Sequence, residues 1–83
     1  MLSATGKLDK GGKAMGYKVK CYPVDGAAGY LERGQIAHAD SMGTYYNHPG
    51  PAVRSAESWV RRHPGSTAEV QTYKDSAVVQ VVS

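Results

Sequence analysis

The side chains that could together form a metal site are Cys21, His38, Asp40, His48 and His63. A zinc site needs ligands that converge, and such ligands usually recur at spacings such as CxxC, HxxxH or HExxH. None of these spacings occurs among the 83 residues. The sequence therefore predicts neither a metal ion nor another cofactor. It favours His63 at the edge of the core and the other two histidines on the surface.

Nucleophilic catalysis would need Cys21 or a serine beside a histidine and an orienting acid. These residue types are present, but no G-x-S-x-G turn occurs, and the seven acidic residues are scattered singly. We therefore expect a protein that is not an enzyme. A lone cysteine cannot form an internal disulfide, so Cys21 is expected to be a buried free thiol in a reducing cytoplasm.

A basic and aromatic pattern gives the strongest indication of binding. Lys18, Lys20 and Tyr22 occupy alternate positions in residues 16–24, where period-two patterning predicts a strand, so they project from one face. Lysines that bind phosphates and tyrosines that stack on bases are typical of sheets that bind single-stranded nucleic acid. The alternative is a solvent face with tyrosines at its edges. The candidate binding residues, including loop tyrosines and helix arginines, are Lys18, Lys20, Tyr22, Tyr45, Tyr46, Arg54 and Arg61.

The net charge of +3 is unevenly distributed. Residues 1–20 hold five lysines against one aspartate, a balance of +4, and residues 21–83 hold five basic against six acidic side chains, a balance of −1. This asymmetry indicates an anionic partner, either nucleic acid or an acidic or nucleic-acid-binding protein. The alternative is a solvated tail that keeps a small protein soluble. No apolar run approaches the roughly 18 residues of a membrane span, so we expect no membrane association.

The elements that must position these residues follow from local patterning. Residues 1–15 are expected to be a flexible basic arm, and residues 16–83 a single α+β domain. The expected strands cover residues 16–24, residues 30–39 with a bulge at Gly34, and residues 67–73 and 77–82, the last two joined as a hairpin. One helix packs on one face of this four-stranded, mostly antiparallel sheet, in the order β-β-α-β-β.

The helix is predicted over residues 51–63. Apolar positions from Ala52 to His63 fall within one arc of roughly 120° at about 100° per residue, and Trp59 is the largest of them. The His-Pro-Gly tripeptides on either side mark its start and its end. The last strand carries valines on both faces, which predicts a strand covered on both sides, or one face in the core and the other in a contact. An exposed valine face would allow a homodimer through edge pairing.

The short length, the absence of a catalytic motif, the element order, the scattered tyrosines and the lysine-bearing strand resemble the small phage-encoded inhibitors called anti-CRISPR proteins. The resemblance is one of outline and involves no shared motif. It implies a stoichiometric inhibitor or adaptor that docks on a protein complex that handles nucleic acid. The other hypothesis is direct binding of DNA or RNA through the lysine-bearing strand and the N-terminal arm. Under either hypothesis the chain could be a monomer or a homodimer.

Overall fold

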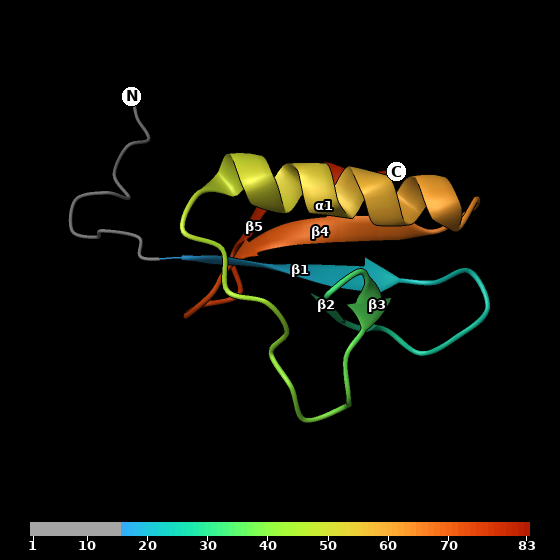
Figure 1. The fold of residues 1–83 in the computed structure, drawn as a ribbon, viewed down its shortest axis with the longest axis horizontal. Coiled ribbons are helices and arrows are strands. Elements are labelled where there is room, and N and C mark those ends of the chain that lie inside the picture. Colours follow the sequence, from blue (N-terminus) through green and yellow to red (C-terminus); the bar gives the residue numbers. More distant parts are fainter. Residues whose placement is uncertain (1–15) are drawn as a thin grey trace.

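Five strands and one helix make up the regular structure of residues 16–83, which are the residues that the computed structural model describes (Figure 1). The expected N-terminal arm, residues 1–15, lies outside the described residues. The elements in chain order are β1 (Tyr17–Tyr22), β2 (Gly29–Glu32), β3 (Gln35–Ile36), α1 (Pro49–Arg62), β4 (Thr67–Thr72) and β5 (Val78–Val82).

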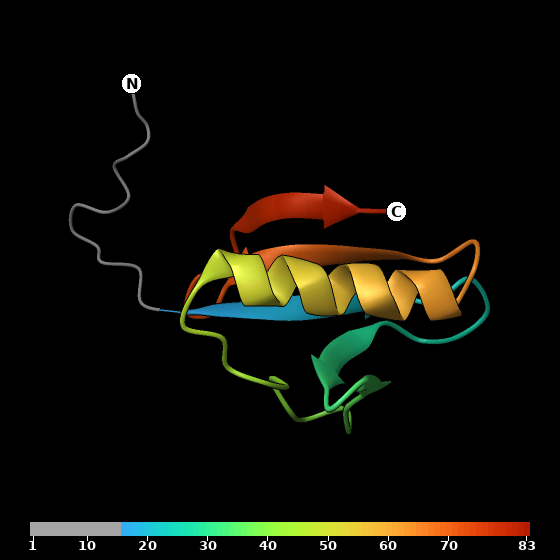
Figure 2. The ribbon, with the colours of Figure 1, turned by 45° about the horizontal axis from the view of Figure 1, so that its top comes forward.

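The strands form one antiparallel sheet in the order β3-β2-β1-β4-β5. β1 is the central strand and pairs with β4 over its whole length, from Tyr17 opposite Thr72 to Tyr22 opposite Thr67. Figures 1 and 2 show α1 lying along β1 and β4 on one face of the sheet. The α+β class and the single helix are therefore confirmed for the described residues.

The expected count of four strands was wrong, because residues 30–39 form a hairpin and not one bulged strand. β2 and β3 pair antiparallel across a two-residue turn at Arg33 and Gly34, whose φ angles are 54° and 82°. Two positive φ angles in a two-residue turn are the signature of a type I′ hairpin, and glycine adopts such an angle at low cost. Gly34 therefore reverses the chain, and β3 becomes one edge of the sheet.

The helix follows the predicted pattern closely. It begins at Pro49, two residues earlier than expected, and ends at Arg62, with His63 as its C-cap residue. Ala52, Ala56 and Trp59 are buried on its inner face, as the helical pattern predicts. Among residues 16–83, the buried core is Val19, Cys21, Leu31, Ala52, Ala56, Trp59, Ala68, Val70 and Val82.

The last strand differs from expectation. β5 is the second edge of the sheet, and Val82 is its one buried residue. The side chains of Val78, Val79 and Val81 are 51%, 48% and 61% exposed, so burial on both sides was wrong. The expected hairpin between β4 and β5 is confirmed, with a bulge where the register shifts between Val70 and Gln71. Within residues 16–83, the one helix is too short and too polar to cross a lipid bilayer.

Cys21 lies beneath α1 and is fully buried, as expected of a structural thiol. Burial raises the pKa of this thiol from 9.0 to about 12, because the thiolate is poorly solvated there. The neutral form is therefore favoured in the native state, and nucleophilic chemistry at neutral pH is disfavoured.

We expect native protein at pH 8 to resist alkylation by iodoacetamide, whereas protein unfolded in guanidinium chloride reacts at once. Since the folded-state pKa exceeds the unfolded-state value, the contribution of Cys21 to stability is complete below pH 9. It declines as the pH rises from 9 towards 12. Mass spectrometry of the alkylated chain measures the first effect, and a Cys21→Ser variant controls for other alkaline titrations. Rapid labelling of the native chain would contradict the buried position.

Candidate functional site

The face of the sheet opposite α1 gathers tyrosine side chains around two lysines. β1 places Lys18 and Lys20 there, because Val19 and Cys21 occupy the alternate positions beneath the helix. We call this surface the tyrosine face, and it comprises Lys18, Lys20, Tyr22, Tyr30, Tyr45, Glu69, Gln71 and Tyr73. Its tyrosines come from β1, from β2, from the loop before α1 and from the residue after β4.

Lys18 is 1% exposed, so the prediction of a solvent-facing lysine at this position was wrong. Its Nζ donates a hydrogen bond to Ser76 Oγ at 2.7 Å. It also lies 4.7 Å from the ring centroid of Tyr30 and 5.7 Å from that of Tyr73. A desolvated cation over an aromatic ring gains about 2 kcal/mol, which helps to offset the cost of burial. Lys18 is therefore an internal support of the face and cannot contact a partner.

Lys20 is half-buried, so its side chain remains partly accessible at the surface. Its Nζ is 5.6 Å from the ring centroids of both Tyr22 and Tyr30. The Tyr30 ring is thus near both lysines, and of the two β1 lysines Lys20 is the one that a ligand can reach.

Hydrogen bonds hold two tyrosine rings of the face in place. Tyr22 donates its hydroxyl to Glu69 Oε1 at 3.2 Å, and Tyr30 donates to Gln71 Oε1 at 3.1 Å. Gln71, which is buried, in turn donates from Nε2 to the same Glu69 oxygen at 2.9 Å. Burial, the charge of Glu69 and the hydrogen bond that Tyr22 donates to Glu69 raise the pKa of Tyr22, so its hydroxyl stays protonated as a donor.

The structure separates the two neighbouring tyrosines of the loop. The Tyr45 ring packs edge-on against Tyr73, with centroids 4.9 Å apart, and is 48% exposed on the tyrosine face. It lies across Gly16, where any larger residue would collide with the ring. Tyr46 instead forms a β-bridge with Tyr17 and packs half-buried against the core, so it does not join Tyr45 on the tyrosine face.

The two predicted helix arginines lie on the other side of the molecule. Arg54 and Arg61 are exposed on α1, which covers the face opposite the tyrosines. They are accessible, as predicted, but because α1 covers the other face of the sheet they do not join the lysines in one surface. Arg62 has a structural role, since it donates to Ser58 Oγ at 2.8 Å and to the Gly34 carbonyl at 3.0 Å. It thereby ties the helix end to the β2–β3 turn.

Sequence reasoning missed Tyr30 and Tyr73 as members of the site. Tyr30 reaches the face because β2 pairs with β1 so that Tyr30 lies opposite Lys20. Tyr73 is held there by its backbone N–H, which donates to the Gly16 carbonyl at 2.9 Å. Alternation within residues 67–73 was a signal that could have placed Tyr73 on the same side as Gln71 and Glu69. The pairing of the strands was needed to bring these residues to Lys18.

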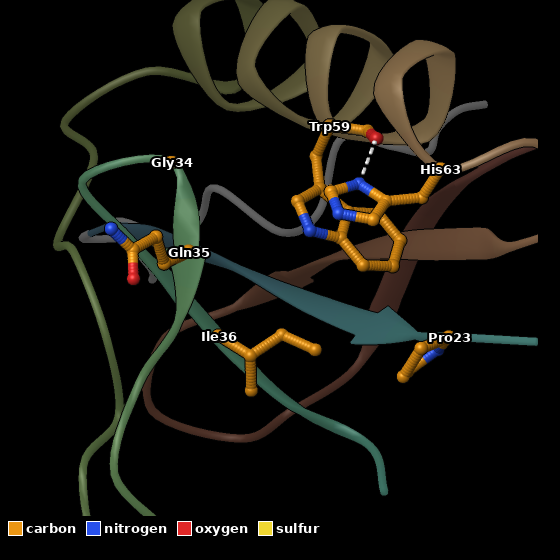
Figure 3. A pocket seen from close by; sticks show the side chains of 6 residues that line it. All are labelled: Pro23, Gly34, Gln35, Ile36, Trp59 and His63. Atoms are coloured by element: carbon orange, nitrogen blue, oxygen red, sulfur yellow. Dashed lines mark hydrogen bonds between the residues drawn. The ribbon is translucent and has the colours of Figure 1, made fainter. Parts of the chain in front are cut away.

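A pocket of about 350 Å³ lies where the end of α1 meets the β2–β3 hairpin (Figure 3). The His63 ring stacks on Trp59 with centroids 4.5 Å apart, and its Nδ1 is 2.8 Å from the Trp59 carbonyl oxygen. Because a carbonyl only accepts, Nδ1 is the donor, and Nε2 of the neutral ring is left as an acceptor. His63 is exposed, and as the C-cap residue of α1 it lies at the margin of the core. The lining residues are Pro23, Gly34, Gln35, Ile36, Trp59 and His63.

This pocket is at the small end of the range for ligand sites, and His63 is its one titratable lining residue. Its volume suits a small ligand, and Pro23, Ile36 and Trp59 give its lining an apolar part. Across residues 16–83, no three His, Cys, Asp or Glu side chains come together as a metal site would require. Comparison of the chain with protein-family models, with curated proteins and with solved structures finds no match.

Charge reversal at Lys18 and at Lys20 should have different effects on stability. Lys18→Glu would place an unpaired carboxylate beneath the Tyr30 and Tyr73 rings, and we expect a loss of about 3–5 kcal/mol in the free energy of unfolding. Lys20→Glu, at the surface, should cost less than about 1 kcal/mol. Urea unfolding followed by tryptophan fluorescence measures both. Lys18→Met, which keeps the apolar stem, should remain folded. Equal losses from the two reversals would show that Lys18 is not buried.

Proposed function

We propose that this chain is a small binding protein without catalytic activity that docks through its tyrosine face onto a partner protein. The main observation in support is that four tyrosines, from segments far apart in the sequence, gather on the sheet face that α1 leaves uncovered. Tyrosine is enriched at protein interfaces and at their energetic hot spots, since it combines a large apolar area with a polar tip.

The rings are ordered before a partner arrives. The Tyr22 and Tyr30 hydroxyls are bonded to Glu69 and Gln71, and the buried Lys18 supports Tyr30 and Tyr73 from beneath. Ordering a free side chain on binding costs about 0.5–1.5 kcal/mol, so a face that is already ordered loses less free energy to ordering. This supports a docking role for the face.

A protein partner is favoured over direct binding of nucleic acid. Lysines that neutralise phosphates must reach them, and Lys18 is committed to an internal position. Glu69 adds a carboxylate at the centre of the same face, where it would repel phosphates. The lysine-bearing strand therefore provides one accessible cation, Lys20, which is too little for a phosphate-binding groove.

The partner that we propose is a protein complex that handles nucleic acid, with this chain as its stoichiometric inhibitor or adaptor in the cytoplasm. The anti-CRISPR resemblance and the concentration of lysines in residues 1–20 support this class of partner. Direct binding of single-stranded nucleic acid is the second candidate, favoured by the neighbouring Lys20, Tyr22 and Tyr30 side chains.

The test uses a purified CRISPR effector–guide complex as the probe. We expect the chain to co-elute with it in size exclusion and to reduce its binding of target DNA. Lys20→Glu and Tyr45→Ala should each weaken this inhibition at least about 10-fold, the equivalent of 1.4 kcal/mol. Arg54→Glu and Arg61→Glu, on the helix side, are matched controls that should keep it.

Absence of co-elution would refute the inhibitor role for this probe, and equal sensitivity to the helix variants would refute the tyrosine face. A mobility shift with short single-stranded DNA and RNA at two salt concentrations tests the second candidate. Steep weakening with salt, about one log–log unit per phosphate contacted, would support it, and no shift at low salt would eliminate it.

A further inference from the structure

The outer edge of β5 is a second surface, and the tyrosine face does not account for it. Within residues 16–83, no strand pairs with β5 on the side away from β4 (Figure 2). The opposite edge of the sheet, β3, is only two residues long. Proteins usually blunt exposed edges by shortness, charge or proline. β3 is blunted in this way, whereas β5 contains four valines, one glutamine and no charged residue.

We infer that β5 pairs antiparallel with β5 of a second copy of this chain, which makes a two-fold symmetric homodimer. The strand reads Val-Val-Gln-Val-Val, and this order is the same in both directions. An axis through Gln80 would set Gln80 opposite its own copy, and Val79 opposite Val81 of the other copy. A two-fold interface must be complementary to itself, and the central Val79-Gln80-Val81 of this strand meets that requirement.

The register of β5 shows where the exposed valines lie. Val81 pairs with Glu69 and Val78 with Gln71, so both side chains stand on the tyrosine-face side of the sheet. Gln80 and Val82 pair with Val70 and Ala68 and stand on the helix side. The bulge adds Val79 without an opposing residue on β4, and it brings Val79 to the same side as Val78.

The proposed axis would therefore bring Val79 of each copy beside Val81 of the other, on one face. This contact would cover apolar surface that is 48% and 61% exposed in the single chain. The absence of charge on β5 also matters, because a two-fold axis sets like charges near one another and identical charged strands would repel. The exposed valines and the absence of charge on β5 thus favour a second copy of this chain as the partner that pairs with this edge.

The resulting sheet would have ten strands, with both tyrosine faces on one side and both helices on the other. This inference goes beyond the proposed function and does not depend on it. If both hold, the dimer presents two docking faces, and a partner with two matching sites would bind with increased avidity.

Sedimentation equilibrium of the full chain tests the inference. We expect a species of twice the 8.9 kDa chain mass that dissociates on dilution. Val81→Lys should give a monomer with an unchanged circular dichroism spectrum, since each lysine would face the apolar Val79 of the other copy. Val24→Lys is the matched control, because Val24 is a 67% exposed valine outside the strands, and this variant should stay dimeric.

A cysteine substitution tests the register. Gln80→Cys should form a disulfide-linked dimer under mild oxidation, because residues that face one another on antiparallel strands lie about 4.5–5.5 Å apart between Cα atoms. Gln35→Cys, on the exposed opposite edge, should not. Native Cys21 is buried and does not compete.

A wild-type monomer at all concentrations, or a dimer that survives Val81→Lys, would overturn the inference. If the chain is monomeric and Val81→Lys abolishes binding to the effector complex, the edge takes a strand of that partner and not a second copy. Failure of the proposed function gives a different result, namely a dimer that dissociates with Val81→Lys but does not bind the effector.

Discussion

The packing of Trp59 against β1 and β4 determines on which face of the sheet the other aromatic side chains lie. The chain has no phenylalanine, so one tryptophan and six tyrosines supply all its aromatic bulk. Trp59 fills the space beneath α1 together with small residues such as Ala52, Ala56 and Ala68. Tyrosine hydroxyls need partners or water, and an apolar layer of this kind offers few. Most of the tyrosines therefore lie on the opposite face, where Glu69 and Gln71 accept hydrogen bonds from Tyr22 and Tyr30.

The tyrosine face is a second, thinner layer of side chains packed around the charge of Lys18. Lys18 lies at its base, with the Tyr30 and Tyr73 rings above it and Ser76 as its hydrogen-bond acceptor. An ammonium group held in this way orders the rings that cover it, and its burial is stable only while they remain in place. Substitutions that remove the Lys18 charge and substitutions that remove the Tyr30 or Tyr73 ring are therefore coupled in their effects on stability.

The two proposed binding surfaces meet on one side of the molecule. The exposed valines of β5 border Glu69 and Gln71, which belong to the tyrosine face. The exposed arginines belong to α1, which covers the other face of the sheet. Pairing through β5 would leave both tyrosine faces accessible, so that self-association and partner binding are compatible.

Patterns within single segments were enough to predict the helix and its buried stripe, β1, the β4–β5 hairpin and the burial of Cys21. Each depends on the spacing of apolar residues or on a turn, and neighbours along the chain set both. The same local signals placed Lys18 on the face away from the helix, which is correct. They could not show that this face is covered there, because the covering rings come from Tyr30 and Tyr73, whose positions depend on how β2 and β4 pair with β1. The exposure of β5 was equally a consequence of strand order, since a valine-rich strand is buried at the centre of a sheet and exposed at its edge.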